Sequence, residues 1–169
     1  LTPILKIEDS NGKVIYQNNL DNKIRVLPAG IAYQLTNILS DNNARAPAFG
    51  SNSVLNIPGQ EVAVKTGTSN NMRDNWTFGY TTNYLVASWV GNNDNTPMSN
   101  IASGITGASP IWSMIMKHLL NGKEEARVFP KPNEMVTVKI CTMTGQLACE
   151  GCPSKEEIFV PGTEPKQAC

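Results

Sequence analysis

The sequence has 169 residues, of which 40% are hydrophobic and 17% charged, as in a globular protein with one ordinary core. Fourteen basic residues balance fourteen acidic ones, so no overall field favours nucleic acid or an anionic membrane surface as a partner. No apolar run approaches the roughly 18 residues of a membrane-spanning helix. Because the chain opens on Leu1 and a strand-like run, we expect a piece of a longer protein.

The first elements predicted are a hairpin and a helix. Residues 4–17 carry apolar runs on both sides of Asn11-Gly12, a dipeptide that favours a tight hairpin because both positions tolerate positive φ. Residues 27–41 predict a helix, with Pro28 in its first turn, and residues 42–59 predict a loop because they are rich in Asn, Gly, Pro and Ser. The apolar stripe expected on the helix consists of Ile31, Leu35, Ile38 and Leu39.

Three strands are predicted in the middle of the chain, over residues 61–68, 75–82 and 84–91. Trp76, Phe78 and Tyr80 alternate with smaller or polar residues, which is the pattern of a half-buried sheet. The three tryptophans of the chain are expected in the core between sheet and helices rather than on a sugar-stacking surface. The other two tryptophans are Trp89 and Trp112.

A second helix and a last strand complete the predicted elements. Residues 108–120 predict a helix with Ser109 as N-cap, Pro110 in the first turn, and the single histidine, His118, as an ordinary packed or surface residue. Residues 135–140 predict a short strand. The order of elements predicts an α+β fold, in which an antiparallel sheet is flanked by helices. The expected apolar face of the helix consists of Ile111, Ile115 and Leu119.

The run Lys65-Thr66-Gly67-Thr68 is the strongest candidate for a functional site. Lysine offers a point charge, threonine hydroxyls hydrogen-bond to carboxylates, and Gly67 permits close approach of another backbone. An exposed strand edge pairs with an extended peptide, and a backbone N–H there stabilises an oxyanion. The alternative is a plain edge strand protected from aggregation by a lysine. Asp74 fits equally a residue that orients the following loop and a solvated turn residue.

Lys-Thr-Gly is one of three motifs of penicillin-binding proteins and serine β-lactamases, beside Ser-x-x-Lys and Ser-x-Asn. The longer stretch "VAVKTGTSNNMRDNWTFGYTTNYLVASWVGNNDN", followed by "GITGASPIWSMIMKHLL", resembles the class A penicillin-binding proteins, the bifunctional cell-wall synthases. So do "NKIRVLPAGIAYQLTNILSD" upstream and the cysteine-containing tail. The resemblance covers nearly the whole chain, and it is far more specific than the three-residue motif alone.

The resemblance implies a transpeptidase without a cofactor. In the family, a serine attacks the D-Ala-D-Ala carbonyl of a peptidoglycan stem peptide, releases the last D-Ala and passes the acyl group to an amine; β-lactams acylate the same serine. Carried over, Lys65 polarises the site, Thr66 and Thr68 bind the terminal carboxylate, the Thr68 N–H is an oxyanion donor, and Gly67 lets the substrate backbone lie close. The resemblance also implies an extracytoplasmic location, in the periplasm or at the cell surface, and a membrane-anchored parent with a glycosyltransferase domain.

The chain departs from the family pattern at the nucleophile. A literal Ser-x-x-Lys at 10–13 falls on the predicted hairpin turn, where serine and lysine lack the shared helical face. The Ser-x-Asn at 69–71 adjoins the Lys-Thr-Gly run and cannot face it across a cleft. We therefore expect residues 1–130 to be the C-terminal half of a transpeptidase domain, without its nucleophile, inactive alone and prone to self-association.

Two alternatives remain open for the function. The first is a non-catalytic peptide- or protein-binding scaffold module of a cell-wall protein. The second, weaker one is a fragment of a serine β-lactamase or D,D-carboxypeptidase. The aromatic-rich pattern after the Lys-Thr-Gly run and the cysteine tail fit the class A penicillin-binding proteins better.

Residues 131–169 are expected to form a cysteine-stapled extension. Its four cysteines could bind zinc, but their spacing fits no common zinc finger. The extracytoplasmic location implied by the resemblance favours two disulfides, with three possible connectivities. Pairing of Cys141 with Cys149 and of Cys152 with Cys169 is the expectation. A redox role for the Cys-x-x-Cys is not expected, because no thioredoxin-like βαβ pattern surrounds it.

Overall fold

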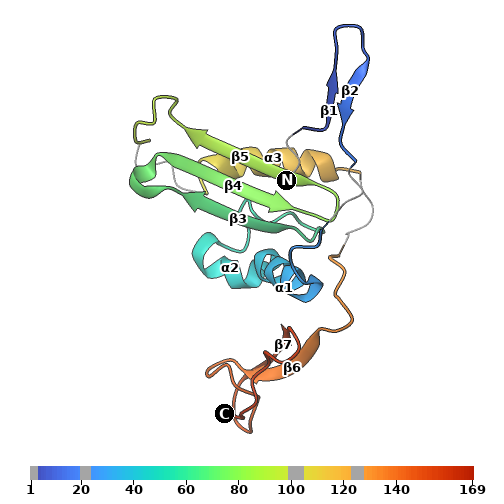
Figure 1. The fold of residues 1–169 in the computed structure, drawn as a ribbon. Helices are drawn as coiled ribbons and strands as arrows, with labels where there is room; N and C mark the ends of the chain where they lie inside the picture. Colours follow the sequence, from blue (N-terminus) through green and yellow to red (C-terminus); the bar gives the residue numbers. More distant parts are fainter. Residues whose placement is uncertain (1–3, 20–23, 99–104, 123–127) are drawn as a thin grey trace.

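A computed structural model describes residues 4–19, 24–98, 105–122 and 128–169 (Figure 1). Its centre is an antiparallel sheet with strand order β3-β4-β5. One helix packs across a face of this sheet, and two shorter helices lie beside β3 (Figure 1). The predicted α+β fold is confirmed. The elements are β3 (Ala63–Thr68), β4 (Asp74–Tyr80), β5 (Leu85–Gly91), α1 (Ala29–Ser40), α2 (Asn42–Phe49) and α3 (Ala108–Leu120).

Helix α1 confirms the predicted helix, whereas α2 occupies part of the stretch predicted as a loop. The carboxylate of Asp41 caps α2 by accepting a hydrogen bond from the backbone N–H of Ala44 at 3.0 Å. Gly50, with φ of 82°, ends the helix. The loop prediction was wrong because it weighted the asparagines and Pro47 above this cap, its glycine stop and the three alanines between them.

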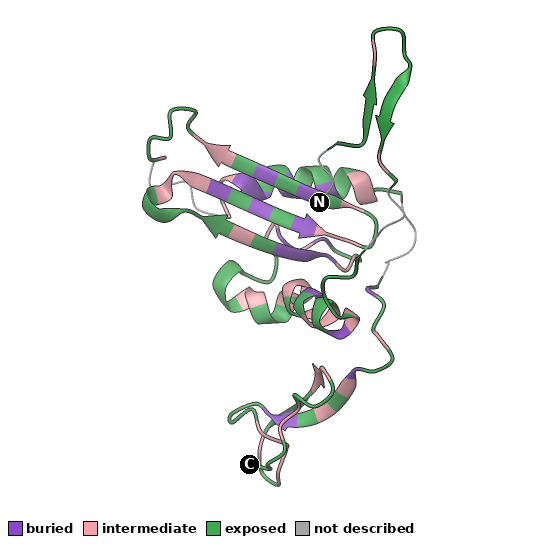
Figure 2. Ribbon diagram, in the orientation of Figure 1, coloured by how far each residue is buried: buried purple, intermediate pink, exposed green. Residues whose placement is uncertain are grey.

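The sheet places small and polar side chains, not its aromatic ones, against α3. Along β4 the buried residues are Asn75, Thr77 and Gly79, and burial alternates along β4 and β5 (Figure 2). Thr77 Oγ1 lies 2.8 Å from Ser109 Oγ, and a Cβ on Gly79 would overlap the indole of Trp112. Small side chains on this face therefore allow α3 to approach closely.

The side chains of Trp76, Phe78 and Trp89 lie on the opposite face, at a part of it that no described element covers, whereas Tyr80 at the end of β4 contacts Thr36 and Phe129. Trp76, Phe78 and Trp89 are 39%, 46% and 41% exposed, and the rings of Trp76 and Phe78 stack with centroids 5.3 Å apart. The alternation predicted for β4 is present, but core positions for Trp76 and Trp89 were wrong. Only Trp112 of the three tryptophans is buried.

Helix α3 begins at Ala108, as predicted, but it packs through a different face. Ser109 is not its N-cap, because the cap position is Gly107. The prediction that Ile111 and Ile115 face the core was wrong, since both stay more than a third exposed. The tight contact at Gly79 draws the tryptophan side of the helix onto the sheet instead. The core consists of Leu55, Ile57, Val62, Val64, Val86, Trp112 and Met116, with Leu119 packed beside it.

The N-terminal hairpin forms as predicted and lies apart from the sheet (Figure 1). It pairs β1 (Lys6–Glu8) with β2 (Val14–Gln17), and every residue of both strands is exposed. The connection is longer than a two-residue turn: the Asp9 carboxylate accepts hydrogen bonds from the N–H groups of Asn11 and Lys13. Gly12 has φ of 80°, the left-handed conformation that glycine permits.

The tail pairs β6 (Val136–Cys141) with β7 (Ser154–Phe159), a strand that the sequence reading missed. Disulfides join Cys141 to Cys152 and Cys149 to Cys169, with Cα atoms 5.7 and 5.5 Å apart. The expected pairing was therefore wrong. Because β6–β7 register sets Cys141 opposite Ser154, its neighbour across the hairpin is Cys152, two residues earlier. The last residues return beside Leu147, which brings Cys169 to Cys149.

The tail also contacts α1. The side-chain amide of Gln34 donates to the carbonyl oxygen of Ile158 at 3.3 Å. Met135 is buried, and its sulfur lies 3.0 Å from where a Cβ on Gly30 would stand. The absence of a side chain at Gly30 therefore lets the tail lie directly on the helix.

Candidate substrate-binding rim at the edge of the central sheet

Strand β3 carries all four predicted site residues and pairs with β4 on one side only among the described residues. Lys65 and Gly67 share the aromatic face of the sheet, because they stand opposite Phe78 and Trp76. Thr66 and Thr68 point to the α3 face, as the pleat requires. Lys65, Gly67 and Thr68 are exposed and Thr66 is half-buried, so all four are reachable from solvent.

The hydrogen-bond pattern of the strand pair fixes where the backbone groups of this run point. The N–H of Ser69 donates to the carbonyl oxygen of Asp74 at 2.9 Å, so these opposed residues form a hydrogen-bonded pair. In an antiparallel ladder such pairs alternate with non-bonded ones. The N–H groups of Thr66 and Thr68 therefore point away from β4, toward the open edge. The Thr66 carbonyl lies at the same edge and accepts from Lys65 Nζ at 2.6 Å.

The packing of the described residues does not require a glycine at position 67. A Cβ there would meet only the Cβ of Trp76, at an ordinary contact distance of 3.9 Å. Its φ is not among the positive values in the structure. Gly79 and Gly91 differ, since a Cβ at either would collide with a tryptophan ring. The bare backbone at Gly67 is thus suited to a ligand or partner that approaches the open face.

A groove of about 270 Å³ runs between the edge of β3 and the helices beside it. Lys65 and Thr66 line it on the strand side, and Arg45 and Asp41 on the helix side. Most of the remaining lining is apolar. This combination of an apolar trough with two cations and one carboxylate suits a ligand that carries both apolar groups and an anionic end. The apolar lining consists of Ile38, Leu39, Phe49, Leu55 and Val64, with Ala44.

Arg45 lines the groove and is a further candidate site residue, which the sequence did not indicate. Its Nη2 donates to the carbonyl of Leu39 at 3.0 Å and its Nε to that of Asp41 at 3.3 Å. Its Nη1 is buried without a hydrogen-bond partner. Partial burial lowers the pKa of the guanidinium, while Asp41 opposes this. A buried N–H without a partner favours binding of an anionic oxygen. Because residues 42–59 were predicted to form a loop, nothing in the sequence indicated that Arg45 lies beside β3.

A buried side chain behind the rim, the run from Lys65 to Thr68, holds the hydroxyl group of Thr68 in place. Asn75 is fully buried, and its Oδ1 accepts a hydrogen bond from the N–H of Ala108 at 2.7 Å. Its Nδ2 donates to Thr68 Oγ1 at 3.3 Å. One amide thus ties the end of β3 to the first turn of α3, and it holds the threonine hydroxyl in a defined orientation.

The turn after the rim is closed by Asp74. Its two carboxylate oxygens accept from Trp89 Nε1 at 3.0 Å and from Ser69 Oγ at 2.9 Å, and these bonds lower the pKa of Asp74. Of the two interpretations left open for Asp74, the hydrogen-bonding one is confirmed. The turn includes the short 3-10 helix η1 (Asn70–Met72).

The serines of the two literal family motifs lie where neither meets Lys65 across a cleft. Ser10 is exposed in the loop of the β1–β2 hairpin, not on a helix. Ser69 directly follows β3, and its hydroxyl is bonded to Asp74. His118 is exposed on α3.

Comparison with known proteins gives matches along almost the whole chain. Residues 131–169 match the family described as penicillin-binding protein 1A, C-terminal domain. Penicillin-binding protein 1A of Escherichia coli (strain K12) is 28% identical over 183 aligned positions, which include 98% of this chain and 21% of that protein. The chain belongs to the penicillin-binding protein 1A family. Its match to the 1A protein of Pseudomonas aeruginosa is 31% identical and includes 76% of this chain and 15% of that protein.

The fold of this penicillin-binding protein 1A chain agrees with a solved relative. The crystal structure of penicillin-binding protein 1A from Haemophilus influenzae superposes with a TM-score of 0.69 at 24% identity, and the match covers 98% of this chain and 30% of that one. The two therefore share a fold. The chain spans about a fifth of the length of the first curated relatives that it matches. Within the part of the chain that the structure describes, no helix is long and apolar enough to cross a membrane.

Proposed function

We propose that this chain supplies the Lys-Thr-Gly-Thr wall of a peptidoglycan D,D-transpeptidase domain, which cross-links stem peptides by serine acyl transfer. The observation that carries the proposal is the open edge of β3. There, outward N–H groups of Thr66 and Thr68, an exposed Lys65 and an unobstructed Gly67 lie beside a groove that contains cations. The nucleophilic serine comes from a part of the transpeptidase domain outside this chain, which alone is inactive.

In the proposed reaction, a stem peptide ending in D-Ala-D-Ala lies antiparallel or parallel along the free edge of β3, as an added strand. The serine hydroxyl attacks the carbonyl carbon between the two D-Ala residues and loses its proton to a base beside it. The Thr68 N–H stabilises the oxyanion, and Lys65 provides a positive charge near the reacting groups. The C–N bond then breaks, and the terminal D-Ala leaves with a proton on its amine.

The second half of the reaction returns the serine. An amine from a neighbouring stem peptide attacks the acyl-serine ester, forms a new amide bond and expels the serine, which recovers its proton. Thr66 and Thr68 bind the carboxylate of the leaving D-Ala through hydroxyl or backbone donors, and Arg45 is a third donor in the adjoining groove. A β-lactam acylates the same serine. No step requires a cofactor.

The domain organisation that we propose divides the chain at residues 130 and 131. Residues 1–130 are the C-terminal half of the transpeptidase domain, and the remaining half packs on the exposed aromatic face of β4 and β5. Support comes from the exposed Trp76, Phe78 and Trp89 and from α1, whose Ile31, Leu35 and Ile38 are all 40% exposed or more. Residues 131–169 form the disulfide-linked extension.

The family membership extends the proposal to the parent protein. We place the transpeptidase outside the cytoplasm, in the periplasm or at the cell surface, where its peptidoglycan substrate and β-lactams are found. The parent is membrane-anchored and carries a glycosyltransferase domain. Disulfides in the tail agree with an oxidising compartment.

A second candidate function is a peptide-binding module without chemistry, and the free edge of β3 favours it equally well. Binding of a D-Ala-D-Ala peptide separates the candidates from an inert fragment. Saturable binding to the isolated chain that is lost in Lys65→Ala, without turnover, supports a binding module or a residual subsite. No binding at all contradicts the module.

Fluorescent penicillin tests the catalytic proposal directly. The isolated chain is expected to form no covalent adduct, whereas the complete transpeptidase domain is expected to be acylated. In that domain extended to residue 169, Lys65→Ala should slow acylation by about 100-fold or more, and Lys139→Ala, which removes an exposed cation in β6 of the extension, should leave it unchanged. An adduct on the isolated chain would show that the nucleophile lies within it, and normal acylation of the Lys65→Ala variant would refute the role of that lysine.

A further inference from the structure

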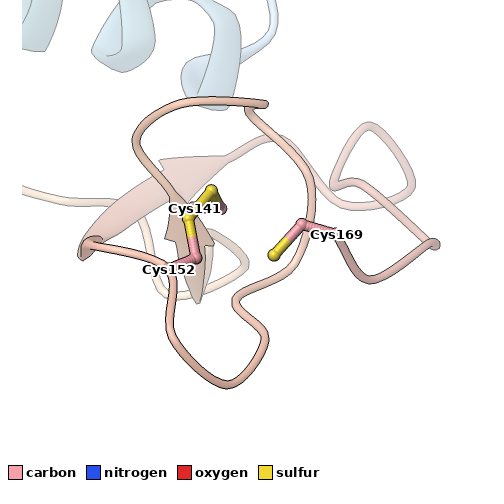
Figure 3. A group of neighbouring side chains, drawn as sticks. All are labelled: Cys141, Cys152 and Cys169. Atoms are coloured by element: carbon pink, nitrogen blue, oxygen red, sulfur yellow. A yellow bond between two sulfur atoms is a disulfide. The ribbon is translucent and has the colours of Figure 1, made fainter.

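The tail brings all four cysteines of the chain to one place. The sulfur atoms of Cys141, Cys152 and Cys169 lie within 4.8 Å of one another, and the Cys169 sulfur points toward the Cys141–Cys152 disulfide (Figure 3). The sulfur of the remaining cysteine, Cys149, is bonded to that of Cys169. Two disulfides thus stand side by side, although the four residues are spread over 29 positions of sequence, from 141 to 169.

Backbone hydrogen bonds hold this cluster independently of the S–S bonds. Cys141, at the end of β6, donates its N–H to Gln146 at 2.8 Å and accepts from Gly145 at 2.9 Å. Cys169 donates its N–H to the carbonyl of Leu147 at 3.0 Å. Because these bonds do not involve sulfur, we expect the strand pair and its loop to keep the cysteine-bearing segments together after reduction.

Cys149 and Cys152 close a tight turn rather than bonding to each other. The N–H of Cys152 donates to the carbonyl of Cys149 at 3.2 Å, and Gly151 between them has φ of 82°. Each end of the turn faces a different partner, one on β6 and one at the last residue. A Cys-x2-Cys turn with two further cysteines bonded to it is, once reduced, the set of ligand residues of a structural zinc site.

We propose that the reduced tail binds one Zn²⁺ through the thiolates of Cys141, Cys149, Cys152 and Cys169, and that this site and the two disulfides are alternative states of the same cluster. A Zn–S bond of about 2.3 Å in a tetrahedron sets sulfur atoms about 3.8 Å apart. The Cys169 sulfur already lies within 4.8 Å of the sulfurs of Cys141 and Cys152, and reduction lets the two bonded pairs, Cys141–Cys152 and Cys149–Cys169, move apart from bonding distance to about 3.8 Å. Cys141 is buried, which suits a closed site without a water ligand.

The conversion of the disulfide-bonded tail into the reduced, zinc-binding tail requires a reductant, and a dithiol balances the electrons and protons. Each protein disulfide takes two electrons and two protons from one dithiol, which becomes a disulfide, and two such steps give four cysteine thiols. Binding of Zn²⁺ then releases four protons as the thiols become thiolates. Oxidation by a disulfide-forming enzyme reverses both steps and expels the metal. The spacing that fits no common zinc finger is accommodated by the β6–β7 hairpin.

Cobalt and zinc titration of the full 169-residue chain tests this site. After reduction by a phosphine and its removal, we expect one equivalent of Co²⁺ to bind with thiolate-to-metal charge-transfer bands and the intense d–d bands of tetrahedral cobalt. One equivalent of Zn²⁺ should displace it, and the oxidised chain should bind neither ion. Octahedral spectra, or equal binding by the oxidised chain, would overturn the proposal.

Variants assign the ligands. Cys149→Ser and Cys169→Ser should each weaken Co²⁺ binding by more than the roughly tenfold that losing an outer hydrogen-bond partner of a ligand costs. Ser154→Ala, at the exposed position opposite Cys141, is the matched control and should bind normally. Alkylation mapping on the unmutated chain covers the case of variants that fail to fold. Zinc should protect all four thiols, and protection of fewer than three contradicts the site.

Discussion

Gly67 and Gly79 lie in neighbouring strands of the sheet but lack side chains for opposite reasons. At Gly79 the neighbouring indole of Trp112 occupies the space that a Cβ would need. At Gly67 the space is open, and only the proposed substrate requires it. A sequence alone cannot separate these cases, because both residues are glycines in strands. The sequence reading recognised Gly67 through the motif around it, and it had no signal for Gly79.

Alanine at these two positions should therefore have contrasting effects. Gly79→Ala should destabilise the fold by about 1–3 kcal/mol or more, because α3 must shift away from the sheet. Gly67→Ala should leave stability unchanged within about 1 kcal/mol, yet slow acylation of the complete domain by penicillin. Denaturant unfolding of both variants, with the acylation rate of Gly67→Ala, measures the contrast. Equal unfolding midpoints for the two variants would contradict the packing of Trp112.

Arg45 should recognise the anionic end of the substrate. Arg45→Gln in the complete domain should weaken binding of a peptide with a free C-terminal carboxylate by about tenfold, since a hydrogen bond to a charged group contributes about 1.5–3 kcal/mol. The amidated peptide should bind both forms alike. Arg25→Gln, an exposed arginine outside the groove, is the control. Equal losses for the free and amidated peptides would show that Arg45 supports the groove without contacting the carboxylate.

Among elements, the β3–β4 turn depends on an ionised carboxylate. Hydrogen bonds from Trp89 and Ser69 lower the pKa of Asp74 below its ordinary value of 3.8. A lowered pKa means that the ionised form stabilises the folded turn. This stabilisation is complete above pH 3.8 and is lost as the pH falls through the lower pKa of the folded state. Asp74 lies on the surface, so the effect is local to the turn.

The indole N–H of Trp89 reports this titration. In an acid titration followed by NMR, its resonance should shift with a midpoint below pH 3.8. In Asp74→Asn the same resonance should lose this pH dependence, because no carboxylate remains to titrate. A midpoint at or above the ordinary value would show that the two hydrogen bonds do not favour the charged form.

Element types were easier to predict than the faces they present. Alternation in β4 and helical spacing in α3 identified both elements, because period is a local property of sequence. The buried face depends on what packs there, and in α3 the overlap at Gly79 and the Thr77–Ser109 hydrogen bond prevail over the isoleucine stripe. Aromatic residues on β4 were assigned to the core because apolar side chains usually lie inside. We attribute their exposure to the proposed remaining half of the domain, which no local pattern in the sequence reveals.

The whole chain exposes apolar surface on both the sheet and α1. We expect it to self-associate in isolation and to bind a dye for apolar surfaces. The double variant Trp76→Thr/Phe78→Thr should reduce both signals, since both side chains lie on the uncovered face. Val128→Thr/Met143→Thr, which removes exposed apolar groups outside the sheet and α1, should not. Size-exclusion chromatography with dye fluorescence measures this, and a compact monomer without dye binding would contradict an uncovered sheet face.

Contact between the tail and α1 has a mechanical consequence for the rest of the molecule. Helix α1 lies against β3 on one flank and against the tail on the other, through Met135 and the Gln34 amide. The tail thus supports α1, which forms one wall of the groove that Lys65 lines. Trimming the chain before Met135 would leave that wall supported from a single side.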